Sequence, residues 1–152
     1  MTEPEAFESE HSLRSGWSAP DPRSVSLPTG VEAMLEDHLN KLRSAVPEMF
    51  GAMVSTTEGV AIANNFPELS SPIVAAMCAE IIRVGVHVTG STGLGEPREL
   101  VIRAHKGYMA VFAAGHSTVL CVSGPPNLNL GLLGIEARRA AARIGKVLDF
   151  GL

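Results

Sequence analysis

The sequence predicts an α/β (α+β) domain built as a three-layer sandwich, with a five-stranded antiparallel sheet between helices in the order α-β-β-α-β-β-β-α. Apolar residues recur at helical spacing in three long segments. Between these segments lie five short apolar runs, most of them joined by tight turns, and tight turns connect antiparallel neighbours. With 152 residues, 45% of them hydrophobic, the chain can bury a core of its own.

The first helix is predicted to begin near Thr29, because Thr29 and Glu32 have the spacing of a capping box. Pro47 ends it, since proline cannot continue a helix. Its apolar face is formed by Val31, Met34, Leu35, Leu39, Leu42 and Val46. The short apolar runs 50–55 and 60–64 follow, and the glycine in the turn between them indicates a hairpin.

The central helix, predicted over 71–88, is apolar on two faces. Pro72 suits its first turn and Gly90 its end. One face carries Val74, Ala75, Cys78, Ala79, Ile82 and Val86, and the sheet can cover it. The second face carries Ile73, Met77, Ile81, Val84 and Val88, bordered by Glu80, Arg83 and His87. In so small a domain this second face requires another molecule, so we expect an obligate dimer.

Three more strands are predicted over 99–105, 108–114 and 117–123. The two tight turns between them give an antiparallel meander, which would leave 99–105 at an edge of the sheet. This strand contains three consecutive apolar residues, Leu100, Val101 and Ile102. An exposed apolar edge is a template for aggregation, so we expect a two-fold copy of the strand to pair with it.

The last helix is predicted over 130–148, with one apolar face and basic residues on the other side. An arginine here, such as Arg139 or Arg143, would stabilise transition-state charge if presented to a nucleotide-hydrolysing partner. The simpler interpretation is that these cations complement the helix dipole and keep an exposed face soluble.

Composition excludes several classes of function. The net charge of −4 argues against nucleic acid as a partner. No uninterrupted apolar stretch approaches the roughly 20 residues of a membrane helix, and no signal peptide pattern is present, so we expect no membrane insertion. Cys78 and Cys121 lie in apolar segments and are predicted to be buried thiols in a reducing cytoplasm.

Residues 1–30 differ from the predicted domain, 31–152. They are acidic and rich in proline and serine, and such a segment is predicted to be disordered because it cannot bury enough apolar surface. Leu13 and Trp17 stand out in it. A solvated tail is the simpler interpretation, and a short docking motif that becomes ordered on a partner is the alternative.

No catalytic residue, cofactor site or metal site is predicted. The five histidines are scattered, and none has metal-ligand spacing to a cysteine or carboxylate. The glycine-rich segment 90–95 lacks the Gly-Lys-Ser/Thr ending of a phosphate-binding loop and follows a helix, so we expect a connector.

Several short motifs occur in a specific order: Leu39-x-x-Leu42 with Pro47, Gly51-Ala-Met-Val-Ser55, Glu58-Gly59-Val-Ala-Ile-Ala63, Ala75-Ala76-Met77, Leu100-Val-Ile102 with Lys106-Gly107, Ala114-Gly115, Val119-Leu120 and Asn129-Leu-Gly-Leu-x-x-x-Glu136-x-Arg138. Together, over about residues 31–148, they resemble the roadblock (roadblock/dynein light-chain) domain family, especially its bacterial and archaeal single-domain members. Glu58 departs from the aspartate that is common in the family, which would only adjust a turn.

The resemblance implies a roadblock/profilin-like fold and a non-enzymatic platform. Roadblock proteins form two-fold dimers through the second helix and third strand and bind Ras-like small GTPases, and some bacterial members act as GTPase-activating partners. For this chain the implied partner surface includes Glu80, Arg83 and His87, with Arg139 and Arg143 as further candidates. The alternative is a structural adaptor that docks a kinase, a motor or another signalling protein without affecting GTP turnover.

Overall fold

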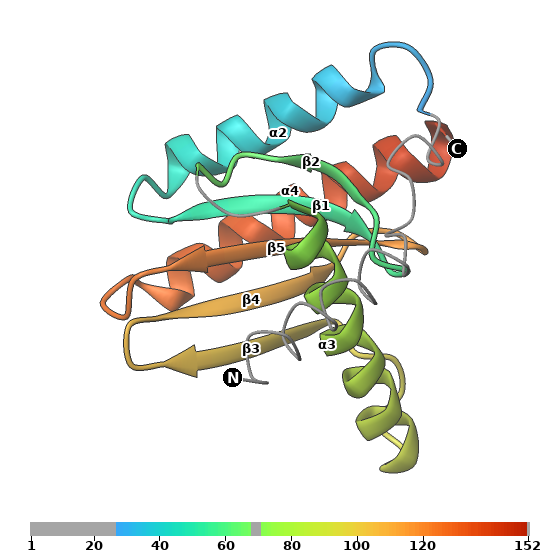
Figure 1. The fold of residues 1–152 in the computed structure, drawn as a ribbon, viewed down its shortest axis with the longest axis vertical. Coiled ribbons are helices and arrows are strands. Elements are labelled where there is room, and N and C mark those ends of the chain that lie inside the picture. The colour runs from blue at the N-terminus through green and yellow to red at the C-terminus, as the bar shows by residue number, and fades with distance from the viewer. Residues whose placement is uncertain (1–26, 68–70, 152) are drawn as a thin grey trace, which may run out of the picture.

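In the part of the chain that the structure describes, one antiparallel sheet separates a single helix from a pair of helices (Figure 1). The computed structural model describes residues 27–67 and 71–151. Its elements are α2 (Val31–Ala45), β1 (Gly51–Thr56), β2 (Ala61–Asn64), α3 (Ser71–Ser91), β3 (Glu99–Ala104), β4 (Gly107–Ala113), β5 (Thr118–Gly124) and α4 (Leu130–Gly151). The strand order β2-β1-β5-β4-β3 confirms the predicted sandwich and places β3 at an edge.

The alternation of side chains along the strands produces two cores. In β1, Ala52 and Val54 face the antiparallel pair α2 and α4, and Met53 faces α3. Leu35 and Leu39 of α2 pack with residues of α4 in the first core. Their helices are therefore held to the sheet by complete burial of one apolar stripe each.

The second core joins α3 to the sheet. It contains Val74 and Cys78 of α3 with Val111 of β4 and Val119 and Cys121 of β5, all buried. The prediction that both cysteines are buried is confirmed, and both are free thiols. The hydrogen bond with Cys78, together with burial, raises the pKa of the Cys121 thiol, which keeps this thiol protonated.

Three local expectations are wrong. Met34, predicted on the apolar face of the first helix, is 49% exposed. The α2 N-cap is Gly30, whose φ of 89° suits glycine, and no side chain caps the helix, so Thr29 and Glu32 do not form a capping box. Val86, expected to face the sheet, is exposed. The reason is that α3 crosses the sheet obliquely and its last turns project beyond β3 (Figure 1).

The predicted tail lies mostly outside the described residues, which begin at Leu27. Leu27 itself is half-buried and packs against the core formed by α2, α4 and the sheet. The chain therefore enters the domain on the α2 and α4 side of the sheet.

Helix α4 approaches the turn after β4 closely at Gly145. A Cβ at this position would lie 2.7 Å from the Gly115 nitrogen and 3.1 Å from the Ala114 carbonyl carbon. Backbone atoms cannot move away as a flexible side chain can, so the contact requires glycine.

We expect Gly145→Ala to lower the free energy of unfolding by about 1–3 kcal/mol through overpacking, although alanine favours helices by about 1 kcal/mol over glycine. The control is Gly90→Ala in α3, where a Cβ would meet nothing within 4 Å. It should leave stability unchanged or raise it by up to about 1 kcal/mol. Urea unfolding followed by circular dichroism measures both, and equal effects would contradict the close contact.

Candidate protein-interaction surface

The outer face of α3 is apolar and uncovered. Ile73, Met77, Val84 and Val88 are exposed by 59%, 46%, 60% and 51%. Ile81, predicted for the same stripe, is half-buried and packs partly against the second core. The four exposed side chains, which we call the α3 stripe, therefore form an apolar surface of the kind that marks an interaction site.

Strand β3 continues this surface. Leu100 packs so closely on α3 that a Cβ at Gly85 would lie 2.6 Å from its Cδ2 atom. Gly85 lies between Val84 and Val88 of the α3 stripe, so helix and strand meet there. Ile102 shares the face of Leu100, whereas Val101 faces the α4 side, and both are about half exposed. Of the predicted interface residues, Val101 therefore stands apart by facing the other side of the sheet.

The edge of β3 also presents unpaired amides. The Ala113 amide donates to the Arg98 carbonyl at 2.9 Å. Since hydrogen-bonded and non-hydrogen-bonded pairs alternate in an antiparallel ladder, Val101, opposite Ala110, belongs to a non-hydrogen-bonded pair. The amides of Glu99, Val101 and Arg103 therefore point away from β4.

Three polar residues predicted for partner binding lie beside the α3 stripe. Glu80 and Arg83 form a bidentate ion pair, with Arg83 donating to the carboxylate at 2.6 and 3.1 Å. Both side chains are more than 60% exposed, and such a pair adds little to stability in solvent. His87 is exposed on the next turn. These groups are available to a partner.

Arg139 and Arg143 do not join this group, because α4 lies on the opposite face of the sheet (Figure 1). Arg139 pairs with Glu136 of its own helix at 3.7 Å. Arg143 faces α2, which carries His38. Burial lowers the pKa of His38, and the positive charges of Lys41 and, more weakly, Arg143 act in the same direction. One partner of ordinary size on α3 would thus not contact them through the same face.

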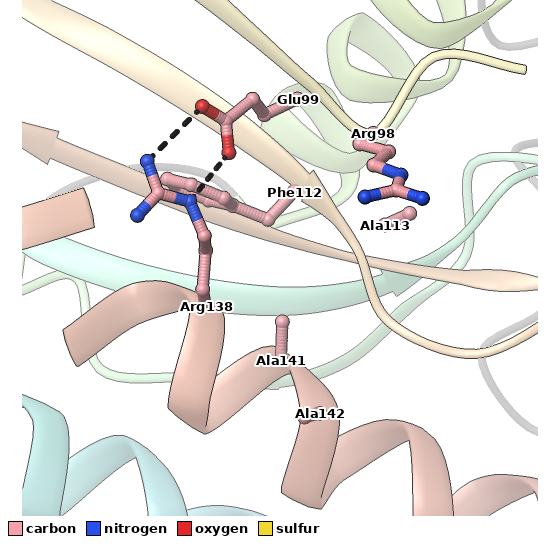
Figure 2. Close-up of a pocket in the computed structure, with 7 residues that line it drawn as sticks. All are labelled: Arg98, Glu99, Phe112, Ala113, Arg138, Ala141 and Ala142. Carbon is pink, nitrogen blue, oxygen red and sulfur yellow. Dashed lines mark hydrogen bonds and ion pairs between the residues drawn. The ribbon is translucent and has the colours of Figure 1, made fainter. Parts of the chain in front are cut away.

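Sequence reasoning missed a groove between the β3 edge and α4. Arg98, Glu99, Phe112, Ala113, Arg138, Ala141 and Ala142 line a volume of about 700 Å³. Figure 2 shows Arg138 and Arg98 on either side of the Phe112 ring. Arg138 donates to Glu99 at 3.0 and 3.3 Å, and this bond raises the pKa of Arg138. The residues come from three elements far apart in sequence, so no local motif could have revealed the groove.

The described residues contain no cluster of histidine, cysteine or carboxylate groups that could hold a metal ion. By length and composition, α3 could cross a membrane even though Glu80 and Arg83 interrupt it. A helix that packs one apolar face on its own sheet and the other on a second chain has the same composition.

The motif order, the three layers and the edge strand agree with one family model. Residues 35–123 match the model of the Roadblock/LC7 domain. The chain belongs to the Roadblock/LC7 domain family. The matched region includes the α3 stripe and β3, and the last motif on α4 lies beyond it. No curated protein matches the chain in sequence at a significant level.

Solved roadblock-domain structures share the fold at low identity. A structure described as MglB with tetrameric arrangement has a TM-score of 0.78 and 16% identity, covering 85% of this chain and 98% of its own. The gliding protein MglB from Thermus thermophilus has a TM-score of 0.76 and 15% identity, covering 84% of this chain and 97% of its own. The Roadblock/LC7 domain from Streptomyces avermitilis has a TM-score of 0.70 and 20% identity, covering 74% of this chain and 95% of its own.

The same layers occur in profilin II from Acanthamoeba castellanii, with a TM-score of 0.54 and 15% identity over 75% of this chain and 96% of that one. At such identities the likeness concerns the fold. The predicted roadblock/profilin-like architecture is thus confirmed.

Proposed function

We propose that this protein is a non-enzymatic, homodimeric platform in the cytoplasm that binds and regulates a Ras-like small GTPase. One form of this regulation is activation of GTP hydrolysis by the bound GTPase. The observation that carries the proposal is the apolar surface shared by the α3 stripe and β3, which the protein's own fold leaves uncovered. Membership of the roadblock family supports a GTPase as the partner.

The dimer is supported by the chemistry of this surface. A second copy would cover the α3 stripe with equally apolar side chains and would pair the free amides of β3 with its own. A solved structure of the same fold, described as MglB with tetrameric arrangement, supports oligomerisation as a property that this fold allows. Pairing across a two-fold axis also brings two copies of Glu80, Arg83 and His87 together.

Activation of GTP hydrolysis would proceed by ordering the GTPase's own catalytic groups. The arginines with a possible direct role, Arg139 and Arg143, lie on the other face of the sheet from Arg83. If either proves essential for hydrolysis but not for binding, the activating role is direct. Binding without any change in turnover would favour the adaptor, which docks a kinase, motor or other signalling protein.

We expect Met77→Asp and Val84→Asp to yield monomer or aggregate. Each buried large apolar side chain contributes roughly 1.5–3 kcal/mol before entropy is deducted, and an unpaired buried carboxylate opposes association. Met34→Asp is the control, because Met34 is exposed to a similar degree on α2. Sedimentation equilibrium measures the mass, and a dimer of unchanged affinity in both α3 variants would rule out this interface.

We expect Val101→Pro to weaken self-association while the domain stays folded, because it removes an amide that points away from β4. Ile102→Pro is the matched control, since it removes an amide of the β3 and β4 ladder and should lower the melting temperature. The two melting curves and the two dimer dissociation constants distinguish the roles. Full dimerisation of the Val101 variant would place the interface elsewhere.

Arg83→Glu should weaken GTPase binding and alter its salt dependence while leaving the dimer intact, because rim charges mainly affect encounter and specificity. Arg139→Glu, on the opposite face, is the control. Binding is measured with purified small GTPases of the same cell loaded with GDP or a non-hydrolysable GTP analogue, since their switches differ between the states. No preference for the GTP form, or undiminished binding by the Arg83 variant, contradicts the assignment.

A further inference from the structure

The groove beside α4 is a built surface whose occupant has to be identified. Phe112, Ala113, Ala141 and Ala142 supply an apolar lining, and about 700 Å³ lies within the range of roughly 300–1,000 Å³ typical of ligand sites. Aromatic side chains bury about 150–250 Å² each. The groove is therefore of a size to receive one or two large apolar side chains.

Its charged groups favour an acidic occupant. Arg138 at one end is bonded to Glu99, so most of its charge is matched within the groove. Arg98 at the other end forms no ion pair with any residue whose side chain the structure describes. The groove thus combines an apolar floor with the guanidinium of Arg98, whose positive charge is not matched by a described carboxylate (Figure 2).

The chain carries a segment of matching chemistry at its start. Residues 1–26 contain five acidic and two basic residues, and Trp17 is the sole tryptophan of the protein. Leu13 and Phe7 are the other large apolar side chains before Trp17 apart from Met1. Glu5 and Glu8 lie on either side of Phe7, and Asp21 follows Trp17 by four residues. A segment that combines aromatic side chains with a net negative charge suits an apolar groove with an arginine at its rim.

The connection to the domain is short. Leu27 packs against the same core that contains Phe112 and Ala141, two residues of the groove, so the chain enters on the groove's side of the sheet. Trp17 lies ten positions before Leu27, and an extended chain spans about 33–36 Å over ten residues. A short flexible tether gives an effective concentration on the order of millimolar, so even a weak intrinsic affinity suffices.

We propose that the N-terminal segment 1–26 of this chain docks in the groove between β3 and α4, with Trp17 on the apolar floor and its acidic residues toward Arg98. The inference does not rest on the proposed GTPase function. It concerns a surface on the opposite face of the sheet from Glu80 and Arg83.

Trp17 provides a direct probe in the full-length protein. Its fluorescence quenching by acrylamide is compared with that of a synthetic peptide 1–26. Docking predicts quenching that is several-fold weaker in the protein than in the peptide, and that increases toward the peptide value as salt screens the charges. Quenching as efficient as in the free peptide would overturn the proposal.

Two groove variants and one control locate the contact. Arg98→Glu and Ala142→Gln, both at exposed positions, should raise quenching of Trp17 to the peptide value. Arg139→Glu reverses one charge on α4 outside the groove and should leave quenching as in the wild type. Equal effects of Arg98→Glu and Arg139→Glu would show a general electrostatic attraction and overturn the assigned site.

Folding and assembly are controlled in the same samples. Unchanged circular dichroism melting shows that the groove variants fold, and the neutral Ala142→Gln tests the groove by volume whereas Arg98→Glu tests it by charge. Trp17 protection that is lost on dilution, in parallel with the dimer, would assign the groove to a second copy and overturn docking by the chain's own segment. Protection independent of concentration supports it.

Discussion

The width of the sheet is the constraint on which the remaining structure depends. Five strands about 4.8 Å apart span roughly 20 Å, whereas one helix with its side chains covers about 10–12 Å. Helix α3 alone covers one face, and α2 and α4 on the other face pack over β1, β2, β4 and β5. Strand β3 contributes no residue to either core. The open strand edge and the groove beside α4 follow from this deficit. The α3 stripe is uncovered because α3 is the only described helix on its side of the sheet.

Periodicity was sufficient to predict the elements and the edge strand. The helical spacing of Leu35, Leu39 and Leu42 has one interpretation, and the tight turns around β4 allow only antiparallel neighbours. The two apolar faces of α3 were visible for the same reason. Val86 was misplaced because periodicity reports which side of a helix a residue occupies and not where the sheet beneath it ends. That limit is set by the crossing angle, which depends on tertiary packing.

The candidate site was predictable in its apolar part and less so in its polar part. Large apolar residues at helical spacing are visible in the sequence itself. Arg138 and Glu99, by contrast, lie 39 positions apart in the sequence, and only the fold brings them into contact. The same holds for Arg83 and Arg143, which looked equivalent as exposed cations on helices. The sheet between them separates their surroundings, so one partner site on α3 excludes Arg143 from its contacts.

In the proposed homodimer, the outward amides of Glu99, Val101 and Arg103 would also set the register between the two copies. In an antiparallel pairing centred on Val101, each of the three outward amides lies opposite a residue of β3 in the other copy. In that register Glu99 of one copy stands opposite Arg103 of the other, twice over. The Glu99 carboxylate would then lie between Arg138 of its own chain and Arg103 of the copy, and a shift by two residues would remove the pairing with Arg103 on both sides. The acid and the base on either side of Val101 would therefore favour one register of the two paired edges.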